Sequence, residues 1–252
     1  MKTKRLYVAT IADDHAELAK KYGLGIELDQ FTYAPYMEPP KYAEKEEKMR
    51  ESMACSDRFV LHAPFADICA AAIDPLVEEV SRRRYQQTFE LAYAHGVKRI
   101  VIHSGYINGV YHPDWYPKKA AAFWRDYLAD KPDDVQLLIE NVMDDIPGPI
   151  ANCVATLDDP RCRICLDIGH AAVHGKVPVA DFISAYAPYL AHVHIHDNDG
   201  TFDQHYPLGQ GTLPLQELIE AIEKEAKPTY TLENTHAADS LIWLEERGIE
   251  LA

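Results

Sequence analysis

Histidine and carboxylate residues end a series of short apolar segments along most of this chain. The segments are VLHAPF (60–65), VIHSG (101–105), LLIEN (137–141), ICLDIGH (164–170), HVHIHDNDGTFDQH (192–205) and YTLEN (230–234). Imidazole and carboxylate groups gathered in one place repel or stay poorly solvated unless a cation joins them. Both are ligands for Zn²⁺, Mn²⁺, Fe²⁺ or Co²⁺, and thiolate is absent from the set. The pattern therefore predicts a divalent-metal centre.

These segments belong to a regular alternation of strands and helices. The expected strands are short runs rich in Val, Ile and Leu, as buried parallel strands are. They are expected at 5–10, 25–31, 59–65, 99–105, 135–142, 163–169, 191–197 and 229–234. Helices are expected between them at 13–22, 42–54, 74–95, 117–129, 148–157, 178–186, 214–226 and 239–247. The third helix illustrates the signals, with Asp74 as a cap, Pro75 in the first turn and Gly96 as the stop.

Eight strands alternating with eight helices in 252 residues predict an α/β fold, a (β/α)8 TIM barrel, as a single domain over 1–252. An open doubly wound sheet is the alternative, disfavoured because no G-x-G-x-x-G follows the first strand. In a barrel, all strand C-terminal ends meet at one mouth, where active sites form. The candidate ligands expected there are His62, His103, Glu140, Asp167, His170, His194, Asp203, His205 and Glu233. Because His192, His194 and His196 alternate and share one face, the choice among them stays open.

Composition limits the partners and the compartment. The formal net charge of −15 argues against DNA or RNA as the main substrate, since proteins that grip nucleic acids usually present a basic face. No apolar run is long enough for a membrane helix, and the N-terminus lacks a signal-peptide core, so a cytoplasmic protein is expected. The five scattered cysteines are expected to be reduced. Cys162 and Cys165 fall within one predicted strand and should face opposite ways, which disfavours a metal or redox pair.

The order of the motifs adds a resemblance to a known family. H-A-P-F, I-H-S-G, I-E-N, L-D-I-G-H, H-x-H-x-x-D, D-x-H-x-x-L-G-x-G and L-E-N, between about residues 59 and 235, resemble the xylose isomerase-like TIM barrel superfamily. That superfamily joins sugar phosphate isomerases and epimerases with endonuclease IV. The resemblance to the isomerases implies one divalent ion bound by Glu140, Asp167, His194 and Glu233, with the two glutamates as acid and base. Related isomerases are commonly dimers or tetramers, which leaves a homo-oligomer open here.

The endonuclease IV branch implies a larger centre of three zinc ions. Its nine ligands correspond to His62, His103, Glu140, Asp167, His170, His194, Asp203, His205 and Glu233, and every ligand type is present in this chain. The resemblance therefore implies one to three divalent ions, and zinc or manganese is the metal expected. Four ligands suffice for an isomerase, so the surplus leaves two functions to weigh.

The first hypothesis is a metal-dependent isomerase or epimerase of a small sugar or sugar phosphate, working through a metal-stabilised enediolate. Tyr106, Tyr111, Trp115 and Tyr116, in the aromatic loop 105–116, are expected to cover the sugar ring. No phosphate-clamping motif is found, so whether the sugar is phosphorylated stays open.

The alternative is a phosphoester hydrolase with two or three metal ions, which the surplus ligands favour. The acidic charge directs this alternative to a small substrate rather than DNA. A non-catalytic metal-binding barrel is a third class, and the intact ligand set argues against it.

Overall fold

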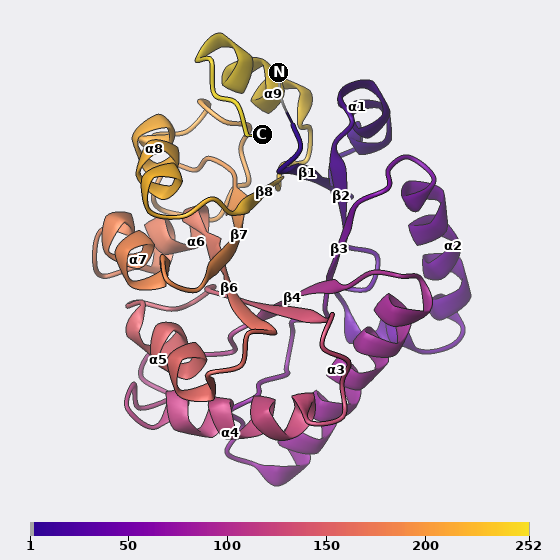
Figure 1. Ribbon diagram of the computed structural model, residues 1–252, viewed down its shortest axis with the longest axis vertical. Coiled ribbons are helices and arrows are strands. Elements are labelled where there is room, and N and C mark those ends of the chain that lie inside the picture. The colour runs from indigo at the N-terminus through magenta and orange to yellow at the C-terminus, as the bar shows by residue number, and fades with distance from the viewer. Residues whose placement is uncertain (1–2, 252) are drawn as a thin grey trace.

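The computed structural model describes residues 3–251, which form a closed barrel of parallel strands surrounded by helices (Figure 1). The strands are β1 (Leu6–Ala9), β2 (Gly25–Leu28), β3 (Phe59–His62), β4 (Arg99–His103), β5 (Gln136–Glu140), β6 (Cys162–Asp167), β7 (Leu190–Ile195) and β8 (Thr229–Leu232). Each strand pairs with the next in the chain, and β8 closes the ring by pairing with β1. The predicted (β/α)8 barrel is therefore confirmed.

The helices form the outer layer of the barrel. They are α1 (His15–Tyr22), α2 (Lys41–Met53), α3 (Pro75–Ala94), α4 (Tyr116–Leu128), α5 (Gly148–Leu157), α6 (Ile168–His174), α7 (Val179–Tyr186), α8 (Leu215–Glu225) and α9 (Ala238–Glu246), with a short 3-10 helix, η1 (Ala34–Met37), before α2. All eight predicted helices are present, whereas α6 and η1 were not predicted. No helix within residues 3–251 is long and apolar enough to cross a membrane.

Predicted and observed strands differ at their C-terminal ends. All eight are present, but each ends one to three residues earlier than expected, because the chain bends away from the barrel while its apolar pattern continues. The clearest case is 163–169, where β6 ends at Asp167 and α6 begins at once. The Asp167 side chain accepts a hydrogen bond from the His170 backbone N–H at 2.6 Å, which caps this helix. This short helix holds His170 at the barrel mouth.

The barrel interior is layered, and the layers decide where the polar residues lie. One layer of the interior contains a small apolar cluster, made of Tyr7, Val60, Val101, Leu138 and Cys165. Cys162 belongs instead to the larger core between strands and helices, so the two cysteines face opposite ways as expected. All five cysteines are free. Because strand side chains repeat their direction every two residues, the next inward layer toward the mouth consists of His62, His103, Glu140 and Asp167.

Candidate metal centre

The Glu140 carboxylate is surrounded by imidazoles at the C-terminal ends of the strands. Its Oε2 lies 3.3 Å from His62 Nε2 and 3.4 Å from His103 Nε2. Its Oε1 lies 3.3 Å from His170 Nδ1 and 3.3 Å from His194 Nδ1. Four histidines, three from β3, β4 and β7 and one from α6, thus converge on one carboxylate that is only 1% exposed.

A second group forms around Nδ1 of His194, on β7. This nitrogen lies 3.1 Å from Glu233 Oε2 and 3.8 Å from Asp167 Oδ2, in addition to its approach to Glu140. One ligand atom from each of the four residues lies within 4.8 Å of the others. These are the four residues that the resemblance implies for a single divalent ion.

The third group comes from α6 and the loop after β7. Asp203 Oδ2 lies 3.2 Å from His170 Nε2 and 3.0 Å from His205 Nε2. The other nitrogen of His205, Nδ1, lies 2.8 Å from the Glu233 backbone oxygen, which orients the ring. Three of the possible metal-holding groups among the described residues together contain all nine candidate ligands: His62–His103–Glu140, Glu140–Asp167–His194–Glu233 and His170–Asp203–His205.

Several polar atoms of this cluster are buried without a hydrogen-bond partner. They include both carboxylate oxygens of Glu140, Nδ1 of His194, Oε2 of Glu233 and Oδ1 of Asp203. An unsatisfied buried polar atom is costly, and native structures contain few of them. A divalent cation accepts lone pairs from these oxygen and nitrogen donors, so the residues present fit a metal ion.

The charges within the cluster are set by burial and by neighbouring groups. Burial raises the pKa of the Glu140 carboxyl, but the imidazoles around it, beginning with His103 and His194, outweigh burial and hold the pKa well below its ordinary value. Burial lowers the pKa of His103 to about 3. Burial also disfavours charge on His62, yet Glu140 raises the pKa of that imidazole to about 9. Glu140 is therefore ionised at neutral pH, while His103 is neutral with a lone pair to offer.

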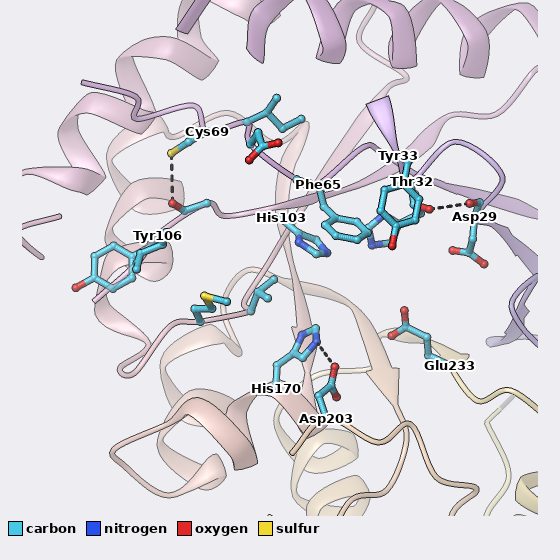
Figure 2. Close-up of a pocket in the computed structure, with 18 of the residues that line it drawn as sticks. Asp29, Thr32, Tyr33, Phe65, Cys69, His103, Tyr106, His170, Asp203 and Glu233 are labelled. Atoms are coloured by element: carbon cyan, nitrogen blue, oxygen red, sulfur yellow. Dashed lines mark hydrogen bonds and ion pairs between the residues drawn. The ribbon is translucent and has the colours of Figure 1, made fainter. Parts of the chain in front are cut away.

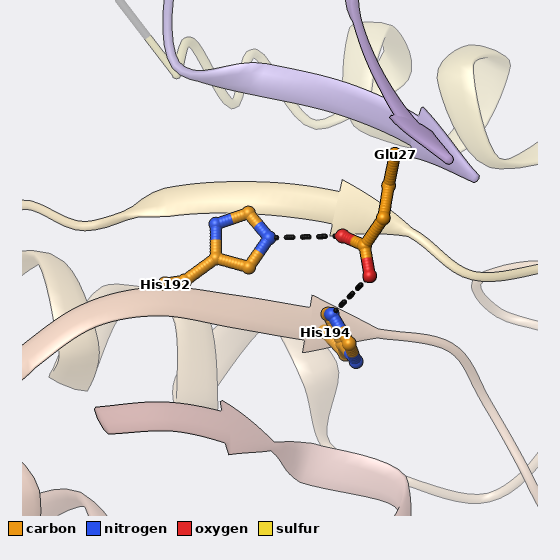
Figure 3. Close-up of side chains that lie close together, drawn as sticks. All are labelled: Glu27, His192 and His194. Atoms are coloured by element: carbon orange, nitrogen blue, oxygen red, sulfur yellow. Dashed lines mark hydrogen bonds and ion pairs between the residues drawn. The ribbon is translucent and has the colours of Figure 1, made fainter. Parts of the chain in front are cut away.

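Glu27, on β2, was not among the expected site residues. It is fully buried, and its Oε1 lies 2.9 Å from His194 Nε2 (Figure 3). Its Oε2 lies 3.2 Å from His192 Nε2 and accepts a hydrogen bond from the Thr231 hydroxyl at 2.6 Å. This contact holds the His194 ring so that its other nitrogen, Nδ1, faces Glu140 and the other mouth carboxylates. The only signal in the sequence was a glutamate within an otherwise apolar strand.

The three alternating histidines take different places. His192 lies one layer below the mouth, between Glu27 and Thr229. Its Nε2 faces Glu27, and its Nδ1 lies close to Oγ1 of Thr229. His196 is buried, with Nε2 at 3.3 Å from Asp167 Oδ1 and its ring stacked on His205 at 4.1 Å. His194 lies between them in sequence, and its Nδ1 faces Glu140, Asp167 and Glu233.

A cavity of about 800 Å³ opens above these ligands. Figure 2 shows His103, His170, Asp203 and Glu233 directed toward it. The lining also includes His62, whereas Glu140 lies beneath and is not among the described residues that line it. Substrate-sized space therefore adjoins Glu233 directly.

The aromatic loop after β4 contributes only part of its expected set. Tyr106 and Tyr111 line the cavity. Trp115 stacks on Tyr111, with ring centroids 6.0 Å apart, but is not among the described lining residues. Tyr116 is buried in the core and donates its hydroxyl hydrogen to the Ser104 carbonyl, so it does not cover a sugar ring as expected. Phe65, which was not predicted, lines the cavity and stacks on His103 at 4.8 Å.

Comparison with curated proteins finds distant relatives. The chain is 25% identical over 68% of its length to the uncharacterized protein MJ1311 of Methanocaldococcus jannaschii, and 28% identical over 66% to MJ1614 of the same organism. It spans 64% and 66% of the lengths of these two relatives. A shorter match, 34% identical over 73 residues, covers 29% of this chain and 26% of a fructoselysine 3-epimerase of Escherichia coli O157:H7.

Solved structures share the fold over nearly the whole chain. A D-tagatose 3-epimerase-like protein superposes with a TM-score of 0.75 at 20% identity, covering 98% of this chain and 96% of that one. A Thermus thermophilus protein, TTHB071, soaked with ZnCl2, superposes with a TM-score of 0.77 at 22% identity, covering 96% and 97%. A family model for the xylose isomerase-like TIM barrel matches residues 16–247. The chain therefore belongs to the xylose isomerase-like TIM barrel family.

Proposed function

We propose that this protein is a divalent-metal-dependent isomerase or epimerase of a small sugar. The observation that carries the proposal is the convergence of Glu140 and Glu233 on one nitrogen of His194, at 3.3 and 3.1 Å. Each carboxylate also has a buried oxygen without a hydrogen-bond partner. Two carboxylates around one position are what proton removal and proton return beside a carbonyl require.

The metal would be held by Glu140, Asp167, His194 and Glu233, with zinc or manganese as the ion that this donor set suits. When bound there, the ion would polarise a sugar carbonyl and its neighbouring hydroxyl and stabilise the negative charge of an enediolate. Glu27 would keep His194 in the tautomer that presents Nδ1 to the mouth.

The chain's own residues account for the proton transfers. Glu233 lines the cavity, so we assign to its carboxylate the removal of a carbon-bound proton next to the carbonyl. In an epimerase, a proton then returns to the same carbon from the other face, and in an isomerase to the neighbouring carbon. We assign proton return to Glu140. Because Glu140 is ionised at neutral pH, it must first take up a proton from solvent, and Glu233 releases the proton that it removed to solvent, so both carboxylates end each turnover as they began. His62 and His103, in the cavity lining, are placed to hydrogen-bond substrate hydroxyls.

Two of the comparisons support this function over others. The names of two similar proteins, the fructoselysine 3-epimerase and the D-tagatose 3-epimerase-like protein, describe sugar epimerases. The match to the first covers 29% of this chain, and the likeness to the second is at 20% identity. The proposed isomerase or epimerase function therefore rests mainly on the arrangement of the carboxylates.

The test is exchange of substrate hydrogen with solvent. Metal-loaded protein, incubated in D₂O with a panel of ketoses, should incorporate deuterium at the carbon beside the carbonyl, as detected by NMR. Glu233→Gln should slow this exchange by about 10²- to 10⁴-fold, the usual contribution of a positioned acid–base group. Glu246→Gln, an exposed change on α9, is the control and should leave exchange unchanged. Exchange that persists in Glu233→Gln would remove this residue from the reaction.

A second function is favoured by one observation, the division of nine ligands into three adjoining groups. A multinuclear phosphoester hydrolase uses two or three ions to activate water and stabilise the leaving oxygen. The net charge of −15 directs such an enzyme to a small phosphodiester rather than DNA. Three ions per chain together with hydrolysis of a small phosphodiester, and no deuterium exchange into ketoses, would establish this function instead.

A further inference from the structure

The cavity above the ligand groups is poor in groups that bind phosphate away from its floor. Within residues 3–251, no lysine or arginine lines it. Its lining holds four carboxylates and four histidines: Asp29, Asp67, Asp203, Glu233, His62, His103, His170 and His205. A phosphate group at the far end of a sugar from the carbonyl, away from the histidines and metal ligands of the floor, would lose water without gaining a lysine or arginine partner. The lining therefore disfavours a phosphorylated substrate.

The outer part of the same cavity is apolar. Its lining includes Tyr33, Phe65, Ile68, Ile107, Val142 and Met143. Three of these side chains are large and well exposed, Tyr33 at 51%, Ile107 at 43% and Met143 at 51%. Apolar side chains grouped at the mouth of a cavity mark a surface that a ligand covers. A polar hydroxylated sugar alone has little to gain from this wall.

The volume of the cavity also favours a substrate larger than a bare sugar. The cavity measures about 800 Å³. Cavities of roughly 300–1,000 Å³ hold ligands of drug size, and a bare hexose, with about a dozen non-hydrogen atoms, is smaller than these. With the sugar at the polar floor beside Glu233, space remains along the apolar wall.

We infer, resting on the isomerase or epimerase function proposed above, that the substrate is an unphosphorylated keto-sugar bearing an apolar or aromatic substituent. The sugar occupies the floor formed by the histidines and Glu233. The substituent lies against Ile107 and Met143, which come from the loops after β4 and β5. The lining, without lysine or arginine among the described residues, disfavours the phosphate form, and the apolar wall favours the substituent.

The test compares three matched forms of each ketohexose: the free sugar, its 6-phosphate and its 6-O-benzyl ether. Their affinities for zinc- or manganese-loaded protein are measured by calorimetry. Burying a phenyl ring against such a wall is worth about 1.5–3 kcal/mol, so the benzyl form of at least one ketohexose should bind about 10- to 100-fold more tightly than the free sugar. The phosphate should bind no more tightly than the free sugar. Tighter binding of the phosphate, no advantage for the benzyl form, or no binding of any form would each overturn the inference.

Variants locate the substituent. Ile107→Ala with Met143→Ala should reduce the benzyl advantage by about tenfold and leave the affinity for the free sugar unchanged. Ile242→Ala, on α9 outside the cavity lining, removes a side chain as exposed as Met143, at 51%, and should change neither affinity. An unchanged benzyl advantage in the double variant would place the substituent elsewhere and contradict the inference.

Deuterium exchange into the same compounds keeps the two proposals separate. Tight binding of the benzyl form without exchange would contradict the proposed reaction and support the substrate class. Exchange with a preference for the phosphate would support the proposed reaction and contradict the substrate class.

Discussion

Replacing Glu27 by glutamine is expected to weaken metal binding although Glu27 is not among the nine candidate ligands. Its carboxylate lies 2.9 Å from His194 Nε2, and both residues are fully buried. Burial raises the pKa of Glu27, but His194 and His192 outweigh burial and hold the pKa well below its ordinary value, so the group is an anion at neutral pH. Glutamine keeps the shape, removes the charge and places an N–H₂ group where one oxygen accepted hydrogen bonds.

The size of the effect follows from what His194 loses. A hydrogen bond to a charged group contributes about 1.5–3 kcal/mol. Loss of the partner that orients a metal-binding histidine typically weakens metal affinity by about 10- to 100-fold, which is the same range of free energy. Because glutamine still offers one oxygen to either His194 or Thr231, we expect a loss of about tenfold to thirtyfold.

The assay is competition between the protein and a chelator of known zinc affinity, which gives the dissociation constant of the purified variant. The chain offers a matched control. Glu46, on α2, lies 2.8 Å from Nε2 of His95, at the end of α3, so Glu46→Gln alters the same kind of contact on the outer helices. Glu46→Gln should change zinc affinity less than about twofold. A Glu27→Gln variant that folds and binds zinc as tightly as the native protein would refute an orienting role for Glu27.

Two further predictions concern stability. Burial raises the pKa of Asp144 to about 7, so the fold prefers its neutral form; the resulting stabilisation is complete below the unfolded-state pKa and is lost as pH rises through about 7. The folded pKa lies about three above the unfolded one, which limits this stabilisation to about 4 kcal/mol. Asp144→Asn is neutral at every pH, so its unfolding free energy should fall less steeply than that of the native protein between pH 5 and 8.5. An equal slope in both proteins would exclude Asp144 as the cause. Removing the metal with a chelator should lower the melting temperature by about 8–16 °C, because an ion present at about a thousand times its Kd stabilises by about 4 kcal/mol and this chain length gives about 2–4 °C per kcal/mol. A melting temperature that does not respond to chelator and to added zinc would contradict binding of this kind.

Much of the barrel and its mouth could be predicted because two simple periodicities act together. Alternating strands and helices fix a barrel, and the pleat repeats side-chain direction every two residues. His62, His103 and Glu140 stand at the ends of their strands, so the barrel alone brings them together.

The residues that were not predicted depend on contacts between distant parts of the chain. Glu27 is one glutamate in an apolar strand, and its role depends on contact with His192, which lies 165 residues further along the chain. Tyr116 was expected at the sugar, but it begins α4 and turns into the core, while Tyr111 stays in the lining. The apolar wall, including Phe65 and Met143, is made by the conformations of loops, which no periodic pattern encodes.

The most direct test of the central claim is a crystal structure of the protein purified with its own metal, with anomalous maps at the zinc and manganese edges and a metal count per chain. The proposed function predicts at least one ion, bonded by Glu140, Asp167, His194 and Glu233. A folded protein that exchanges substrate hydrogen with solvent and contains no divalent ion at these residues would contradict it.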